Sequence, residues 1–225
     1  MRCPSATRAQ LSRRYVDIDV IGHRKETGKI NQLFKDLGYK PRERFNAFQV
    51  TRLIFNDLKN SRRVDVFLDV FEMCHKFDFK NRMDLEANTL PMSDLLSTKL
   101  QIVEINEKDM KDILAILLDH DLSEEESFDR INGKYIAELC AGDWGIYKTF
   151  TANLAKVPEF ASRVGLEEVP KKLAMERAAA LSKFIEEAPK SMRWKMRAAV
   201  GERRKWYELP EADREVVDSA AAVAK

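Results

Sequence analysis

The chain has 225 residues, of which 44% are hydrophobic and 34% are charged. This length is enough for one large or two small hydrophobic cores, so a soluble globular protein is expected. Its 39 lysine and arginine residues against 37 acidic residues leave a net charge of +2, which excludes a uniformly basic nucleic-acid coat. No apolar run approaches the roughly 20 residues that cross a bilayer, and residues 1–14 lack the apolar segment of a secretory signal. We therefore predict a cytoplasmic protein without a membrane partner.

The first elements of the chain are predicted to be a strand and a helix. Residues 15–21 are rich in β-branched side chains that alternate with Asp17 and Asp19, which predicts a strand with both acids on one face. Apolar residues then recur at helical spacing from Ile30, and the pattern stops at Gly38, which is typical of a helix end. This order indicates a strand followed by a helix that packs against it.

A hairpin is predicted next. Residues 52–56 and 63–71 have strand-like composition and flank the polar segment 57–61, which favours an antiparallel pair joined by a short turn. Together with the first strand, these segments predict a sheet of at least three strands. Asp65 and Asp69 are expected to project from the same face of the second hairpin strand.

The second half of the chain is predicted to be helical. From residue 91 the apolar residues recur with a period near 3.6, and the acidic stretch 119–129 is interpreted as an exposed junction. A further helix is expected around Leu181, and a terminal helix after Pro210. The predicted fold class is α/β (α+β), with a mixed-sheet domain at 1–118 and a helical domain at 119–225.

The acids on the predicted strands are the candidate functional residues. Nucleotidyl transfer depends on divalent cations that bridge the phosphates, and carboxylates on a rigid strand supply their ligands. Asp17 and Asp19 lie in an otherwise apolar strand, and either Asp65 or Asp69 could add a third ligand. The alternative is a solvated sheet face on which these acids pair with nearby arginines, namely Arg13, Arg14, Arg62 or Arg63.

In these residues the chain resembles the DNA polymerase β-like nucleotidyltransferase superfamily, and within it the AbiEii-type toxins of type IV toxin–antitoxin systems. The resemblance covers roughly residues 12–118. Its parts are the Asp17-Ile18-Asp19 strand, the Val64-Asp65-Val66 strand, the helix at 94–100 and the helix at 108–113. It implies a mixed-sheet nucleotidyltransferase core.

The resemblance also implies an activity and its residues. Asp17, Asp19 and Asp65 would be the catalytic acids that bind Mg²⁺ or Mn²⁺, and Asp65 would aid deprotonation of the acceptor hydroxyl. The nucleotide-binding candidates are Lys99, Arg14 and Asp112. The expected reaction moves a nucleoside monophosphate from an NTP to an acceptor such as tRNA or another RNA, and a cognate antitoxin is an expected partner. For Lys99 the alternative is a surface lysine beside Glu104 or Asp94.

One departure from the family pattern concerns the triphosphate. The superfamily places a Gly-Gly or Gly-Ser pair at the start of a helix before the acidic strand, where backbone amides hold phosphate. No such pair precedes Asp17, and Ser5 follows Pro4. This predicts weakened nucleotide binding. Either the sequence begins at an internal methionine, or the chain is a degenerate member of the superfamily.

The basic segment 189–207 motivates an alternative function. It carries seven positive charges and one negative charge, and Trp194, Trp206 and Tyr207 are interleaved with them. Such a segment could hold RNA, or it could form an amphipathic helix in which Trp194 and Met196 or Trp206 pack inward while lysine and arginine stay solvated. The alternative to a transferase is therefore a catalytically silent protein of the same fold that binds RNA or a protein partner. A hydrolase that uses the same acids is disfavoured by the absence of a histidine cluster.

Overall fold

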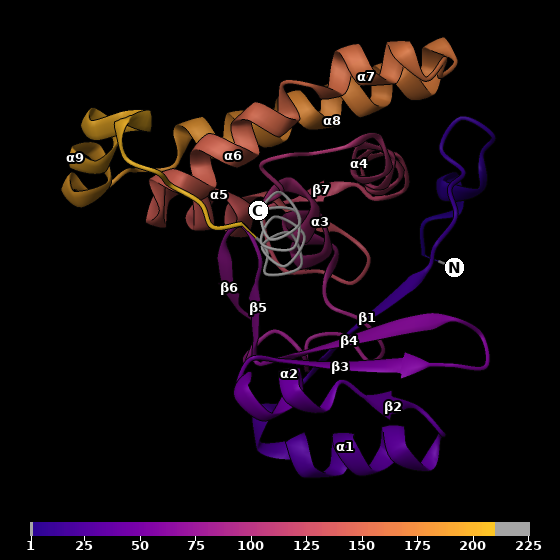
Figure 1. Ribbon diagram of the computed structural model, residues 1–225. Coiled ribbons are helices and arrows are strands. Elements are labelled where there is room, and N and C mark those ends of the chain that lie inside the picture. The colour runs from indigo at the N-terminus through magenta and orange to yellow at the C-terminus, as the bar shows by residue number, and fades with distance from the viewer. Residues whose placement is uncertain (1, 210–225) are drawn as a thin grey trace, which may run out of the picture. The chain divides into compact units, whose positions relative to one another are not determined.

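The computed structural model describes residues 2–209, which divide into two compact units. The sheet unit consists of residues 13–72 and 76–90, and the helical unit consists of residues 2–12, 73–75 and 91–209. The mixed α/β class is confirmed, since one unit carries a mixed sheet and the other is mainly helical (Figure 1). These units do not coincide with the expected domains 1–118 and 119–225, because the helices after residue 91 pack with those that follow residue 119.

The sheet unit contains a four-stranded sheet in the order β1-β4-β3-β2. β1 runs parallel to β4, and the other neighbours are antiparallel, so the predicted hairpin and the prediction of at least three strands are confirmed. The strands are β1 (Asp17–Gly22), β2 (Lys40–Pro41), β3 (Arg52–Asp57) and β4 (Arg62–Leu68). Figure 1 shows β1 and β4 side by side. β1 lies at the edge of this sheet.

One face of the sheet is covered by a helix. After the short turn η2 (Arg24–Glu26), α1 (Thr27–Asp36) runs beneath the sheet and ends before Gly38, whose φ of +80° suits glycine, so this predicted helix is confirmed. Ile30 and Phe34 pack against buried side chains of β3 and β4, and the Phe34 ring stacks on Phe55 with centroids 4.4 Å apart. The core of this unit therefore lies between α1 and the sheet.

The strand predicted at 63–71 is broken at Asp69. β4 ends at Leu68, Asp69 has a φ of +60°, and the chain resumes as β5 (Val70–Glu72), which pairs with β6 (Lys76–Asp78) in a separate ladder. The prediction that Asp65 and Asp69 share a strand face is therefore wrong. An aspartate adopts this left-handed conformation more readily than most residues, and here it turns the chain out of the sheet. The remaining helix of the unit is α2 (Glu43–Phe48).

The helical unit follows the period predicted for the second half. Its first helices are α3 (Met92–Leu100) and α4 (Glu107–Asp119), and the Asn106 side chain accepts hydrogen bonds from the amides of Lys108 and Asp109 at the start of α4. The helix expected around Leu181 is α8 (Glu168–Glu187). The other elements are η1 (Pro4–Thr7), β7 (Leu122–Ser123), β8 (Ile131–Asn132), α5 (Gly133–Gly142), α6 (Trp144–Leu154), α7 (Val157–Arg163), α9 (Met192–Val200) and η3 (Gly201–Arg203).

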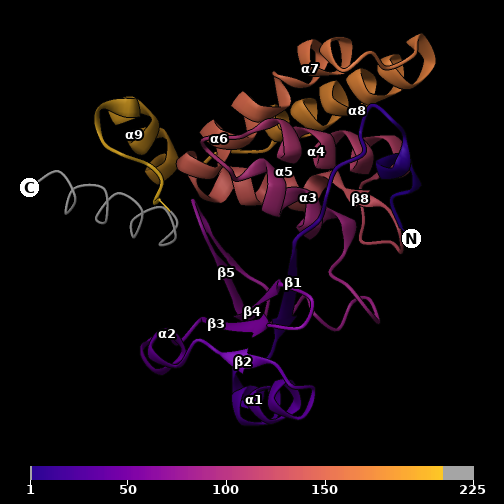
Figure 2. The ribbon, with the colours of Figure 1, turned by 45° about the vertical axis from the view of Figure 1, so that its right-hand side comes forward.

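Figure 2 shows these helices from a second direction. α5 and α7 both contact α8, and Arg177 of α8 donates hydrogen bonds to the carbonyl oxygens of Leu117 and Leu118 at the end of α4. Residues 2–5 are fixed to the same end of α4, because the Ser5 amide and hydroxyl both donate to the Asp119 carboxylate. The terminal helix expected after Pro210 lies outside the described residues. Within residues 2–209, every helix is too short or too polar to traverse a bilayer.

Candidate functional site

The three acids predicted from sequence share one face of the sheet. β1 and β4 are in register, with Asp17 beside Arg63 and Asp19 beside Asp65. Because alternate residues of a strand face opposite sides, these acids point away from the face that α1 covers, whereas Val64 and Val66 point toward α1. Neighbouring strands lie about 4.8 Å apart, so carboxylates from β1 and β4 can contact one small ligand. We call Asp17, Asp19, Asp65, Arg52 and Arg63 the acid face.

Asp65 is held between two arginines on this face. Arg52 donates to its Oδ1 through Nε at 2.9 Å, with Nη2 at 2.8 Å from the same oxygen. Arg63 donates to Oδ1 through Nη2 at 3.0 Å. The Asp65 side chain is only 5% exposed, so these guanidinium groups replace most of its hydration. The sequence analysis gave an alternative in which the acids of the sheet pair with nearby arginines, and the contact between Asp65 and Arg63 agrees with it.

The two arginines are not held equally. The Arg52 side chain is 15% exposed and its guanidinium lies 5.1 Å from the centroid of the Phe67 ring, so it is fixed by packing as well as by charge. The Arg63 side chain is 31% exposed. Its buried Nε lies 2.9 Å from Asp65 Oδ2, at an angle that makes no hydrogen bond. Arg63 is therefore the more easily displaced partner of Asp65.

The acid face fits a divalent cation in part. Mg²⁺ and Mn²⁺ favour carboxylate oxygens, and Asp17 and Asp19 are both exposed on β1. Asp65, however, presents its oxygens to guanidinium groups, and residues 2–209 contain no cluster of three side chains already placed as metal ligands. The exposed acids of β1 could thus hold a cation directly, whereas Asp65 could join them only after Arg63 moves.

Two further residues of the sheet unit lie outside the acid face. Arg14, a predicted nucleotide-binding residue, is exposed and precedes the first paired residue of β1. Asp69, the other candidate for the third acid, lies beyond the end of β4, where its Oδ1 is 3.2 Å from Nδ1 of His23. The structure therefore places Asp65, and not Asp69, beside Asp19.

Lys99 and Asp112, the other predicted nucleotide-binding residues, belong to the helical unit and contact each other. Lys99 Nζ lies 2.9 Å from Asp112 Oδ2 and 3.9 Å from Asp109 Oδ1. The side chains of Asp112 and Asp109 are only 11% and 16% exposed, and that of Lys99 is 28% exposed. The ammonium group thus links α3 to α4, and its partners differ from Glu104 and Asp94, which the sequence suggested.

We expect Lys99→Met to lower the free energy of unfolding by about 1–3 kcal/mol, because two largely buried carboxylates then lose the ammonium group that they share. Adding Asp112→Asn to this variant should restore part of the loss. A double-mutant cycle measured by urea unfolding gives the coupling energy of the pair. If the losses of the two single variants add up to the loss of the double variant, the contact between Lys99 and Asp112 contributes nothing to stability.

The aromatic residues of the basic segment 189–207 pack inward. Trp194 donates from Nε1 to the carbonyl oxygen of Cys140, and its ring meets Tyr147 edge-on with centroids 5.0 Å apart. Trp206 packs edge-on against Trp144, and its Nε1 donates a hydrogen bond to Thr149 Oγ1 at 3.3 Å. The inward packing predicted for Trp194 and Trp206 is confirmed, although Trp206 follows the helices of the segment, and the inward packing predicted for Met196 is wrong because its side chain is exposed.

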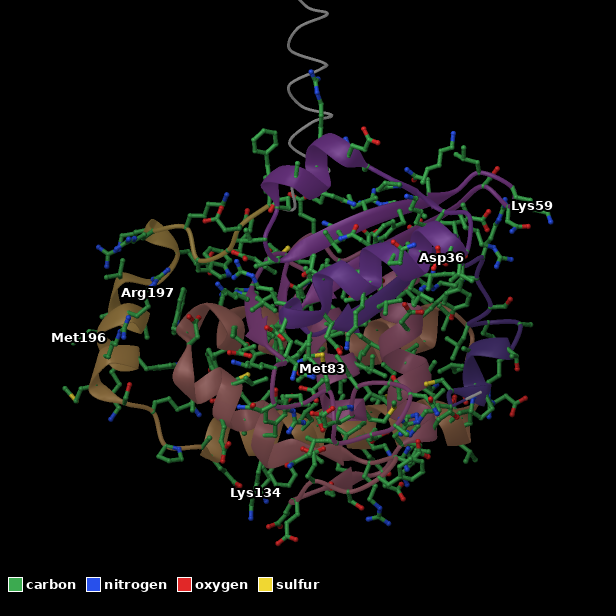
Figure 3. The ribbon with its side chains drawn as sticks, turned by 90° about the horizontal axis from the view of Figure 1, so that it is seen from below. Asp36, Lys59, Met83, Lys134, Met196 and Arg197 are labelled. Atoms are coloured by element: carbon green, nitrogen blue, oxygen red, sulfur yellow. The ribbon has the colours of Figure 1, made fainter. Side chains whose placement is uncertain are left out.

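Several basic groups of the segment donate hydrogen bonds to carbonyl oxygens at or just after helix ends. Lys190 donates to the carbonyl oxygen of Glu186 at the end of α8, and Arg197 donates to those of Gly201 and Arg204 after α9. Figure 3 shows Met196 directed away from α9, and this side chain is 63% exposed. The exposed basic groups are Arg193, Lys195, Arg203, Arg204 and Lys205. They form a charged surface without exposed tryptophan.

The sequence reasoning missed Arg52. Its place on the acid face follows from the register of the β3–β4 hairpin, in which Ile54 lies opposite Asp65 and Arg52 opposite Phe67. The sequence prediction did not contain this, because a turn at 57–61 would pair Arg52 with Val66 and place it on the face opposite Asp65, whereas the observed pairing of Asp57 with Arg62 places Arg52 beside Phe67. Comparisons with protein-family models, with curated proteins and with solved structures found no match for this chain.

Proposed function

We propose that this chain is a metal-dependent nucleotidyltransferase that moves a nucleoside monophosphate from an NTP to an acceptor. The observation that supports the proposal is the parallel register of β1 and β4, which gathers Asp17, Asp19 and Asp65 on one sheet face. Three carboxylates on one sheet face, two of them exposed, suit a phosphoryl-transfer site, because they can hold the cations that bridge phosphates. The finer identity, an AbiEii-type toxin with a nucleotidyltransferase core, belongs to the same proposal.

In the proposed reaction, Asp17 and Asp19 would hold Mg²⁺ or Mn²⁺, and the ion would supply positive charge against the triphosphate. Asp65 orients the acceptor hydroxyl and accepts its proton, and Arg52 fixes the position of Asp65 through its two contacts with Oδ1. RNA, with tRNA as the first candidate, is the proposed acceptor. The role of Lys99 at the phosphates, like that of Arg14 and Asp112, stays a prediction from the resemblance.

The experiment measures incorporation of label from each α-phosphate-labelled NTP into total tRNA, with Mg²⁺ or Mn²⁺. We expect the double variant Asp17→Asn, Asp19→Asn to lose at least about 100-fold in rate, because the cation loses its charged ligands. Asp36→Asn is the matched control, since Asp36 is an exposed acid of the same unit on α1 (Figure 3). Label that is unaffected in the double variant would overturn the assignment of these acids.

A second candidate function is a catalytically silent protein of the same fold that binds RNA. The pairing of Asp65 with Arg52 and Arg63 favours it, because that carboxylate is already charge-balanced. It predicts RNA binding that needs no NTP, falls steeply with salt and weakens in the variant Arg204→Gln, Lys205→Gln. Absence of label from folded protein together with such binding would favour this candidate over the transferase.

A further inference from the structure

The pairing of Asp65 with Arg63 bears on the order in which ligands bind. The acid face carries three acids and two arginines, so its formal charge is −3 + 2 = −1. A single net negative charge attracts a divalent cation weakly, and Arg63, the register partner of Asp17, contacts Asp65. The protein without nucleotide is therefore poorly prepared to bind a metal ion.

We propose that Arg63 exchanges partners, from Asp65 in the free protein to the triphosphate of an incoming NTP, and that this exchange makes metal binding depend on nucleotide. The inference rests on the proposed function, and it names a residue that the resemblance does not assign. When Arg63 moves, Asp65 Oδ2 is released, while Arg52 keeps Oδ1 in place through its own contacts. The guanidinium remains in the complex and adds its charge to the phosphate side.

The chemistry of Arg63 suits this exchange. A guanidinium binds carboxylate and phosphate with the same fork of N–H groups, so one acceptor can replace the other without loss of geometry. Its Nε at present makes no hydrogen bond with the oxygen that it faces, and a triphosphate offers several better-placed oxygens. Arg52 lacks this freedom, because it is less exposed and packs over Phe67.

The experiment measures Mn²⁺ binding by electron paramagnetic resonance, with the purified chain alone and with α,β-methylene analogues of the four NTPs. In the wild type, we expect an analogue to strengthen Mn²⁺ binding at least about tenfold beyond what the analogue binds by itself. In Arg63→Gln, Mn²⁺ binding without analogue should rise about tenfold, because the face becomes more negative and Asp65 is released, and affinity for the analogue should fall.

Two control variants sharpen the experiment. Arg62→Gln removes a neighbouring charge that alternation places on the opposite face of β4, so it should leave Mn²⁺ binding without analogue unchanged. Arg63→Lys keeps the charge and loses the fork, so Mn²⁺ binding alone should stay weak while affinity for the analogue falls. If circular dichroism shows that Arg63→Gln does not fold, the proposal is tested with Arg63→Lys instead.

The possible failures are distinguishable. If the wild type and Arg63→Gln bind Mn²⁺ equally well without analogue, the role of Arg63 is overturned, and the transferase proposal stands on the labelling experiment. If folded wild type binds no Mn²⁺ with or without any analogue and transfers no label, the proposed function fails and the inference fails with it.

Discussion

Asp65→Asn should lower the free energy of unfolding by about 3–5 kcal/mol, because it leaves two arginines on a sheet face without their shared anion. Asp65 is buried and contacts both guanidinium groups at 2.8–3.0 Å, so the lost interaction is poorly screened by water. Urea unfolding followed by far-UV circular dichroism measures the change. Asp17→Asn is the matched control, and its exposed position predicts a change within about 0.5 kcal/mol.

Removing an arginine as well should restore part of this stability. In Asp65→Asn with Arg63→Gln, only Arg52 is left without its anion, so the double variant is expected to be more stable than Asp65→Asn alone. A loss below about 1 kcal/mol in Asp65→Asn would show that the cluster contributes little. If Asp65→Asn is added to the labelling experiment, its transfer rate must be corrected for the fraction of folded protein.

Acid should destabilise the helical unit through His75. Its side chain is buried, Nε2 lies 2.8 Å from Thr149 Oγ1, and desolvation lowers the pKa of His75 from 6.5 to about 4. Between these two pKa values the unfolded chain binds a proton that the folded chain does not. The contribution of the neutral His75 imidazole to the free energy of unfolding is therefore complete above pH 6.5 and falls as the pH drops toward 4. The full loss is about 3 kcal/mol, reached near pH 4.

Tryptophan fluorescence reports this effect, since Trp144, Trp194 and Trp206 all lie in the helical unit and Trp206 also approaches Thr149. The free energy of unfolding, measured by urea titration, should fall between pH 7 and pH 5 in the wild type. In His75→Gln this fall should be smaller by about 2 kcal/mol, because glutamine does not titrate. If both proteins show the same pH dependence, the buried imidazole does not cause the acid destabilisation.

Much of the sheet unit could be predicted from its sequence. The alternation around Asp17, the helix end at Gly38 and the polar turn before Arg62 are local signals, and each corresponds to an element of the structure. The break at Asp69 could not be predicted in the same way. Left-handed backbone is usually marked by glycine, and an aspartate within an apolar run reads as a continuing strand.

The candidate site was predicted less fully than the fold. The strand pattern was sufficient to place Asp17 and Asp19 on one face, and the parallel pairing that brings Asp65 beside them depends on long-range contacts. Partner choice also depends on such contacts, since Lys99 pairs with Asp112 of the next helix and not with the acids near it in sequence. The assignment of residues 73–75 to the helical unit has no local signal at all.

The position of β1 at the edge of the sheet gives Asp17 and Asp19 a second consequence. Within residues 2–209 only β4 pairs with this strand, and Ile18 and Val20 are 39% and 37% exposed. A flat apolar edge would be a template for aggregation with other chains, and charged side chains at alternate positions prevent such stacking. We therefore expect purified Asp17→Asn, Asp19→Asn protein to associate at lower concentration than the wild type, because the edge of β1 then carries no charge at these positions.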